Sequence, residues 1–277
     1  MAIIAVTLAV LGFLVIRKAR PANNKVGHGF NAAPDISDQS NPVHPIALDD
    51  IGEQEGVLKL ATYNIQTGKS LQGKRDIHCS ARVIASAHLV GVQEVYAPSW
   101  LNKLGFGLSQ SEALAAIGGF KWLFSATRLR WLREHRGNAL FSKLPVGDWQ
   151  VKMLPDQSGK SYRNLTIANV QWGDKTFHVL NTHLHTRDGR KQQIDVVLRE
   201  FAKYSPAILM GDFNCTASEL TNALSDIEIT DAIAIADLDP QNDRRIDWIL
   251  VKGFTVEGGQ FQDKGVSDHP YYQVNLR

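Results

Sequence analysis

Polar side chains that could hold a cation or a phosphate stand at the ends of predicted strands. They are Asn64, Glu94, His183, Asp212, Asn214, Asp247, Asp268 and His269. A single Asn, Asp or His at such a place is usually a turn residue or a satisfied, partly buried side chain. Their recurrence at successive strand ends instead indicates an oxygen- and nitrogen-donor site for a hard cation and a phosphate.

The same set contains no activated nucleophile. No Ser or Cys in it has a base beside it. Cys215 follows Asn214 directly, but nothing nearby in the sequence would lower the pKa of its thiol, so we interpret it as structural. The residue types therefore favour attack by an activated water over a covalent enzyme intermediate.

The elements that must position these residues are short apolar strands with a few helices between them. Strands are predicted at 57–64, 89–95, 120–126, 165–172, 176–182, 206–211, 245–251 and 271–276. Helical spacing covers 75–88 and 189–204, and a capping box at Thr216–Glu219 opens a helix over 217–225. So many strands exceed the needs of a simple doubly wound sheet and predict an α/β fold of two packed sheets flanked by helices.

Seven segments resemble, in order, the motifs of the endonuclease/exonuclease/phosphatase superfamily. They are LATYNIQTGKS, VGVQEV, RGNALFSKLPV, LNTHLH, ILMGDFN, RIDWILV and GVSDHP, and they are spread over essentially all of the region 57–277. The superfamily includes deoxyribonucleases, abasic-site nucleases, sphingomyelinases and inositol-polyphosphate phosphatases. The resemblance implies a four-layer α-β-β-α sandwich with two mixed β-sheets packed face to face.

The resemblance also implies a metal site. Glu94 matches the main carboxylate ligand of a Mg²⁺ or Mn²⁺ ion, and Asn64 and Asp268 match residues close to that metal. A small hard cation that keeps several waters suits such oxygen donors.

The remaining motif residues match groups that act on the phosphoester. Asp212 and Asn214 resemble the pair that positions the attacking water and the phosphoryl oxygens. His269 resembles the acid/base histidine, held by Asp247. His183 resembles a second histidine that donates to the phosphate.

Two weaker candidates for phosphate contacts are Asn138 and Arg163. An arginine cluster over 128–136 is either a solvated amphipathic helix or a lip for an anionic substrate, with Trp131 stacking on a base or entering a lipid interface. We expect metal-dependent hydrolysis of phosphodiesters, in nucleic acid first. The alternative substrate is phospholipid or another membrane-surface phosphoester, and a catalytically inactive membrane-tethered binding module is the alternative of another class. No obligate protein partner is evident.

The first sixteen residues carry no charge and are followed by Arg17, Lys18 and Arg20. A short apolar run with basic residues behind it predicts an N-terminal transmembrane helix, so residues 1–20 are expected to form a single-pass anchor in the cell membrane. Because the basic residues follow the run, the catalytic domain is expected on the cytoplasmic side.

Residues 21–56 are expected to be a flexible linker, rich in Pro, Asn, Gly and acidic side chains, with ordered structure beginning near Val57. The catalytic domain is therefore predicted over 57–277. The formal net charge of +2 over 277 residues is too small to indicate strong nucleic-acid binding by charge alone. It averages an acidic segment over 1–56, with four basic and six acidic side chains, and a mildly basic domain.

Overall fold

The structure is a computed structural model. It describes Val6, Val10, Gly12, Asn102 and Leu104 and the ranges 18–35, 56–98, 107–130, 134–156, 162–187, 189–221 and 229–277.

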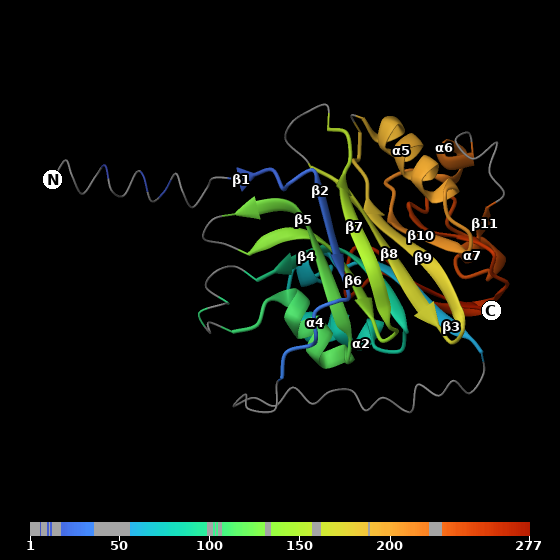
Figure 1. The fold of residues 1–277 in the computed structure, drawn as a ribbon, viewed down its shortest axis with the longest axis horizontal. Coiled ribbons are helices and arrows are strands. Elements are labelled where there is room, and N and C mark those ends of the chain that lie inside the picture. The colour runs from blue at the N-terminus through green and yellow to red at the C-terminus, as the bar shows by residue number, and fades with distance from the viewer. Residues whose placement is uncertain are drawn as a thin grey trace.

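Two mixed sheets form the centre of the molecule (Figure 1). The first has the order β1 (Lys18–Ala19), β5 (Lys121–Arg130), β6 (His135–Ser142), β4 (Leu89–Ala97), β3 (Leu58–Asn64), β14 (Tyr271–Leu276) and β13 (Val256–Gln262). The second has the order β11 (Thr230–Asp231), β12 (Asp247–Lys252), β10 (Ala207–Asp212), β9 (Lys175–His183), β8 (Asn164–Trp172), β7 (Val146–Met153) and β2 (Asn24–His28). Pairing is parallel between β3 and β4 and between β9 and β10, and antiparallel elsewhere.

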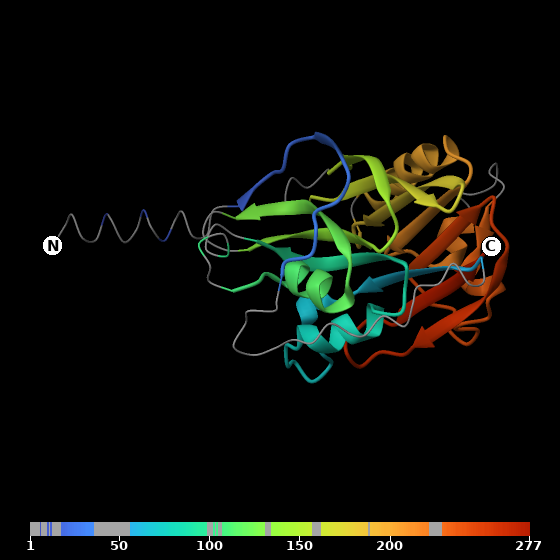
Figure 2. The same ribbon diagram turned by 60° about the horizontal axis from the view of Figure 1, so that its bottom comes forward.

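Helices cover the two outer faces (Figure 2). The first sheet carries α2 (Ile77–Ile84) and α4 (Gln110–Gly118), and the turn η2 (Gln66–Gly68) follows β3. The second carries α5 (Arg190–Ala202) and α6 (Ala217–Thr221), and α7 (Ala232–Ile235) lies between β11 and β12 in the chain. The α4 helix begins at a capping box, in which Ser109 Oγ accepts from the Glu112 N–H and Glu112 Oε2 accepts from the Ser109 N–H.

Strand alternation divides the apolar side chains among three cores. Along β10, Ile208 and Met210 face the first sheet, whereas Leu209 faces α5. Along β3, Leu60 faces the second sheet and Tyr63 faces the helices. The predicted architecture of two packed mixed sheets flanked by helices is therefore confirmed.

The expected linker is wrong for its first part. Residues 24–28 form β2, which pairs with β7, and Asn31 bridges to Trp122 of β5. An edge strand needs no apolar alternation, because backbone pairing alone can hold it and its side chains can face water. Val26 is accordingly 78% exposed. Residues 36–55 lie outside the described residues.

Most of the expected anchor over residues 1–20 also lies outside the described residues. In the part of the chain that the structure describes, no helix is long and apolar enough to cross a bilayer.

The helical interpretation of the arginine cluster is wrong. Arg128 and Arg130 belong to β5 and Arg136 belongs to β6, and the two strands pair as an antiparallel hairpin. Residues 131–133, with Trp131, lie outside the described residues.

Candidate active site

Three polar residues form one row across the second sheet. In the register of β9, β10 and β12, His183 pairs with Asp212 and Asp212 pairs with Asp247. All three are buried. The Asp212 side chain lies on the same face of β10 as Ile208 and Met210, which pack between the sheets. The three residues of the row therefore point into the space between the sheets.

A glycine permits the close approach of two of these strands. Gly211 has a φ of +138°, and a Cβ there would lie 1.9 Å from the Thr182 carbonyl oxygen of β9. Only glycine fits a position with this backbone conformation and this contact.

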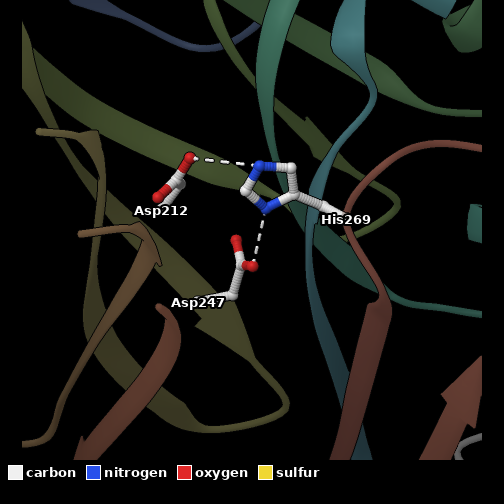
Figure 3. Close-up of side chains that lie close together, drawn as sticks. All are labelled: Asp212, Asp247 and His269. Atoms are coloured by element: carbon white, nitrogen blue, oxygen red, sulfur yellow. Dashed lines mark hydrogen bonds and ion pairs between the residues drawn. The ribbon is translucent and has the colours of Figure 1, made fainter. Parts of the chain in front are cut away.

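The first sheet and the segment before β14 complete the cluster. Across the gap between the sheets, Asn64 Nδ2 donates to Asp212 Oδ2 at 3.0 Å. His269 Nδ1 lies 2.8 Å from Asp247 Oδ2, and its Nε2 lies 3.7 Å from Asp212 Oδ2 (Figure 3). One carboxylate oxygen of Asp212 thus faces Asn64, His269 and, at 3.3 Å, His183 Nε2.

The two histidines beside Asp212 differ in charge. Burial lowers the pKa of His269, but the carboxylates of Asp247 and then Asp212 outweigh it and raise that pKa to about 9. For His183, burial and the nearby positive charge of Arg163 hold the pKa well below the ordinary value. His269 is therefore an imidazolium at neutral pH, and His183 is a neutral imidazole.

Asp212 is a carboxylate with an unusual affinity for a proton. Burial, and then the charge of Asp247, raise its pKa to about 7. The Asn214 N–H donates to Asp212 Oδ1 at 3.0 Å, and Asn214 Nδ2 donates to the Leu184 carbonyl oxygen. Asn214 has a left-handed φ of +52°, which Asn tolerates better than most residues. It therefore fixes the loop that holds Asp212.

Glu94 is placed by a β-bulge. Val92 pairs with Ala139 and Val95 pairs with Gly137, so Gln93 and Glu94 together oppose one residue of β6. Glu94 has a φ of +57°, a conformation that is costly for a non-glycine residue. Its carboxylate forms an ion pair with Arg136.

Asp268 is held by a residue that sequence reasoning missed. Gln66 Nε2 donates to Asp268 Oδ2 at 2.7 Å, while the Gln66 N–H donates to Asn64 Oδ1 at 3.1 Å. Gln66 and the next residue, Thr67, both have positive φ, at 45° and 56°. The only signal for Gln66 in the sequence is its place two residues after Asn64.

A family model for the endonuclease/exonuclease/phosphatase family matches residues 61–269, a span that contains each of these side chains. The chain belongs to this family. Members of the endonuclease/exonuclease/phosphatase family generally are hydrolases of phosphoester bonds that use divalent metals. No curated protein matches the chain.

Solved structures of the family share the fold at low identity. A protein of the family from Beutenbergia cavernae has a TM-score of 0.66 and 22% identity, over 80% of this chain and 71% of that one. The catalytic domain of human Nocturnin with bound sulfate has a TM-score of 0.59 and 18% identity, over 80% and 93%. Danio rerio TDP2 complexed with a single-strand DNA product has a TM-score of 0.57 and 15% identity, over 80% and 100%.

The donor set fits the divalent cation that the family uses. The predicted ligands Glu94, Asp268 and Asn64 carry two carboxylates and an amide oxygen, donor types that Mg²⁺ and Mn²⁺ prefer. Asp212, Asp247 and His269 form a second group whose donor atoms lie within 4.8 Å of one another. In that group His269 and Asp247 already bind each other, which suits proton transfer.

The two predicted phosphate contacts lie in different environments. Asn138 is buried, and its Nδ2 donates to Asn164 Oδ1 at 3.1 Å, so it bridges the two sheets. Burial lowers the pKa of Arg163, while the charges of Asp212 and Glu94 oppose that shift. Among the described residues, the buried Nε of Arg163 has no hydrogen-bond partner. Arg163 therefore has a free donor close to the carboxylates of the site.

Proposed function

We propose that this chain is a metal-dependent phosphodiesterase that hydrolyses phosphodiester bonds in nucleic acid by attack of an activated water. One observation carries the proposal: Asp212 Oδ2 faces Asn64, His183 and His269 at one edge of the space between the sheets. Such convergence of a carboxylate, two imidazoles and an amide suits proton transfer at a phosphoester.

In this proposal Asp212 accepts the proton of the attacking water. Asn64 and the Asn214 N–H hold the carboxylate in place. Asp247 fixes the ring of His269 through Nδ1, so that Nε2 faces the reaction and exchanges a proton with the phosphoester. His183 lies on the other side of Asp212 and donates to a phosphoryl oxygen.

Glu94, Asp268 and Asn64 are proposed to hold a Mg²⁺ or Mn²⁺ ion. When bound, the ion would neutralise charge on the phosphoryl oxygens. Arg163 is proposed to bind the substrate phosphate through its free donor, and Asn138 to support that wall of the site from β6.

Nucleic acid is the first candidate substrate, because the fold resembles that of Danio rerio TDP2, which is known in complex with a single-strand DNA product. Phospholipid is the second candidate, because the apolar residues 1–16 favour attachment to a membrane. We propose that residues 1–20 anchor the chain in the cell membrane with the domain on the cytoplasmic side. Membrane fractionation with protease accessibility tests both parts.

The full chain should be incubated with single-stranded and duplex DNA, RNA, phosphatidylinositol, sphingomyelin and bis(p-nitrophenyl) phosphate, with Mg²⁺ or Mn²⁺ and with EDTA. We expect metal-dependent cleavage of nucleic acid that His269→Ala abolishes and the exposed control Asp174→Asn retains. Turnover of lipid alone would favour the second candidate. Absence of hydrolysis of every ester would leave a tethered binding module.

A further inference from the structure

The catalytic residues all lie at one edge of the two sheets, here called the active-site edge. It contains the carboxyl ends of β3, β9 and β10, which carry Asn64, His183 and Asp212, and the amino end of β12, which carries Asp247. Strand directions extend it further. The carboxyl end of β5 belongs to it, because β5 and β4 both run antiparallel to β6 and β4 runs parallel to β3.

The N-terminal part of the described chain crosses this same edge. Lys18 of β1 pairs with Arg130, the last residue of β5. Asn24 of β2 pairs with Lys152, and the Asn23 carbonyl oxygen accepts from the Met153 N–H at the end of β7. Figures 1 and 2 both show β1 against the tip of β5 at one end of the molecule. Residues 20–23 therefore pass from the first sheet to the second along the active-site edge.

This pairing removes the spacer that the sequence predicts between the apolar run and the domain. A flexible linker of 36 residues would allow a root-mean-square separation of about 30–36 Å. In the structure β1 begins at Lys18, and only Arg17 separates it from the last apolar residue, Ile16. Two residues span at most about 7 Å. A membrane anchor that ends at Ile16 would therefore hold β1, and with it the active-site edge, close to the bilayer.

The charge of this edge suits an anionic surface. Arg20 is exposed, with its guanidinium 5.6 Å from the centre of the Tyr162 ring, and Arg130 lies 5.6 Å from the centre of the Tyr96 ring. Burial, and then repulsion from Arg136 and Arg130, lower the pKa of Arg128, which shows how closely these cations are grouped. The cytoplasmic leaflet is anionic and attracts basic groups near a membrane anchor.

We infer that the active-site edge is the membrane-facing surface of this protein, with β1, Arg20 and Arg130 against anionic lipid head groups. The inference rests on the membrane attachment proposed above and adds the orientation of the domain. The substrate then enters from the side of the bilayer. No long flexible linker separates the domain from the proposed anchor, because β1 and β2 are strands of the fold.

The orientation can be tested with the full chain bound to vesicles of phosphatidylcholine and phosphatidylserine. Thr186→Cys places a label on the active-site edge, three residues after His183, and Asp174→Cys places one in the exposed turn at the opposite end of β9. The strand between them spans about 30 Å. Both variants carry Cys79→Ser, because Cys79 is half-buried whereas Cys215 is fully buried.

Lipids with a quencher on the head group should quench the label at position 186 several-fold more than the label at position 174. Equal quenching, or stronger quenching at 174, would overturn the orientation. Flotation of the same samples tests membrane attachment separately from orientation. A chain that floats with the vesicles but shows the reverse quenching is attached in another orientation. A chain that does not float overturns both the attachment and the orientation. Hydrolysis of soluble phosphodiesters tests the proposed activity, and it is measured independently of attachment and orientation.

The charge contribution has a matched control. Arg20→Gln with Arg130→Gln should weaken the preference for anionic over neutral vesicles, by roughly fivefold for each residue. Lys175→Gln with Arg199→Gln removes the same charge from the start of β9 and the last turn of α5, at the opposite end of the molecule, and should leave the preference unchanged. An equal loss in the two variants would overturn the assignment of the contact to the active-site edge.

Discussion

The space between the two sheets has one apolar end and one polar end, built from the same strands. On the inner face of β9 the side chains run Phe177, Val179, Asn181 and His183. The inner face of β10 changes in the same direction, from Ile208 through Met210 to Asp212. On each strand the same face points between the sheets throughout, while the side chains on that face change from hydrocarbon to titratable groups.

Between the two ends lies a layer of uncharged polar groups that join the sheets. Gln93 Nε2 donates to Asn181 Oδ1 at 2.9 Å, and Ser125 and Thr166 share a hydrogen bond between their hydroxyls. Buried polar groups are costly unless they are hydrogen-bonded, and buried charges are costlier still. The amide and hydroxyl layer therefore separates the hydrocarbon core from the charged groups, while the core holds the strands that aim those groups at one another.

The largest effect should come from the polar end. His269→Ala removes the imidazole that Asp247 holds and should lower kcat by about 10²–10⁴-fold, the usual contribution of general acid–base catalysis. Because its loss also leaves the buried carboxylate of Asp247 without its imidazolium partner, the variant should lose stability as well, and kcat is therefore referred to the folded fraction. Steady-state kinetics with thermal melts measure both. Near-parental turnover would remove His269 from the mechanism.

The apolar end should show the opposite pattern. Leu60 is fully buried in the core between the sheets, and Leu60→Ala should lower the free energy of unfolding by about 2–5 kcal/mol. The kcat of the folded fraction should stay near the parental value, since Leu60 is four residues before Asn64 on β3. Urea denaturation measures the free energy of unfolding, and activity normalised by active-site titration measures the kcat of the folded fraction. A loss of kcat comparable to that of His269→Ala would mean that the two ends are not separate.

The intermediate layer should give an intermediate effect. Asn181→Leu removes the acceptor through which Gln93 joins the second sheet and the side-chain donor to the Ala139 carbonyl oxygen, and leaves Gln93 Nε2 with its acceptors in the first sheet alone. Such a loss costs about 1–3 kcal/mol of folding free energy. Removing both amides, in Gln93→Leu with Asn181→Leu, should cost less than the sum of the single changes. A strictly additive double variant, measured in urea, would argue against the layer as a joined unit.

The ends of the inner faces could be predicted from the sequence, but the layer between them could not. Asp212, Asp247 and His183 come at the ends of strands whose apolar residues mark them clearly. Gln93 and Asn181 lie inside apolar strands, and their pairing across two sheets depends on a packing that no local pattern encodes.

Other elements were missed for local reasons. The edge strand β2 has no apolar alternation, and β13 contains two glycines, so neither gives a strand pattern. The α4 helix has the Ser109–Glu112 capping box in its sequence, a local pattern that marks where the helix starts. The position of Glu94 requires a bulge in β4, which depends on the register with β6 rather than on local sequence.

The smallest expected effect is the coupling between the two ends, and it provides the sharpest test of their separation. Leu60 and Asn64, which borders the catalytic cluster, are four residues apart on β3, or about 13 Å. Changes at this separation without shared partners usually add within about 0.3–0.5 kcal/mol. Leu60→Ala combined with His269→Ala should therefore show the kcat of the second variant and a loss of stability equal to the sum of the two single losses. A coupling free energy above about 1 kcal/mol, in urea unfolding or in kcat, would show that strain at the apolar end reaches the catalytic groups through β3. In that case the amide layer would transmit displacement between the ends, rather than isolate the catalytic groups from the core.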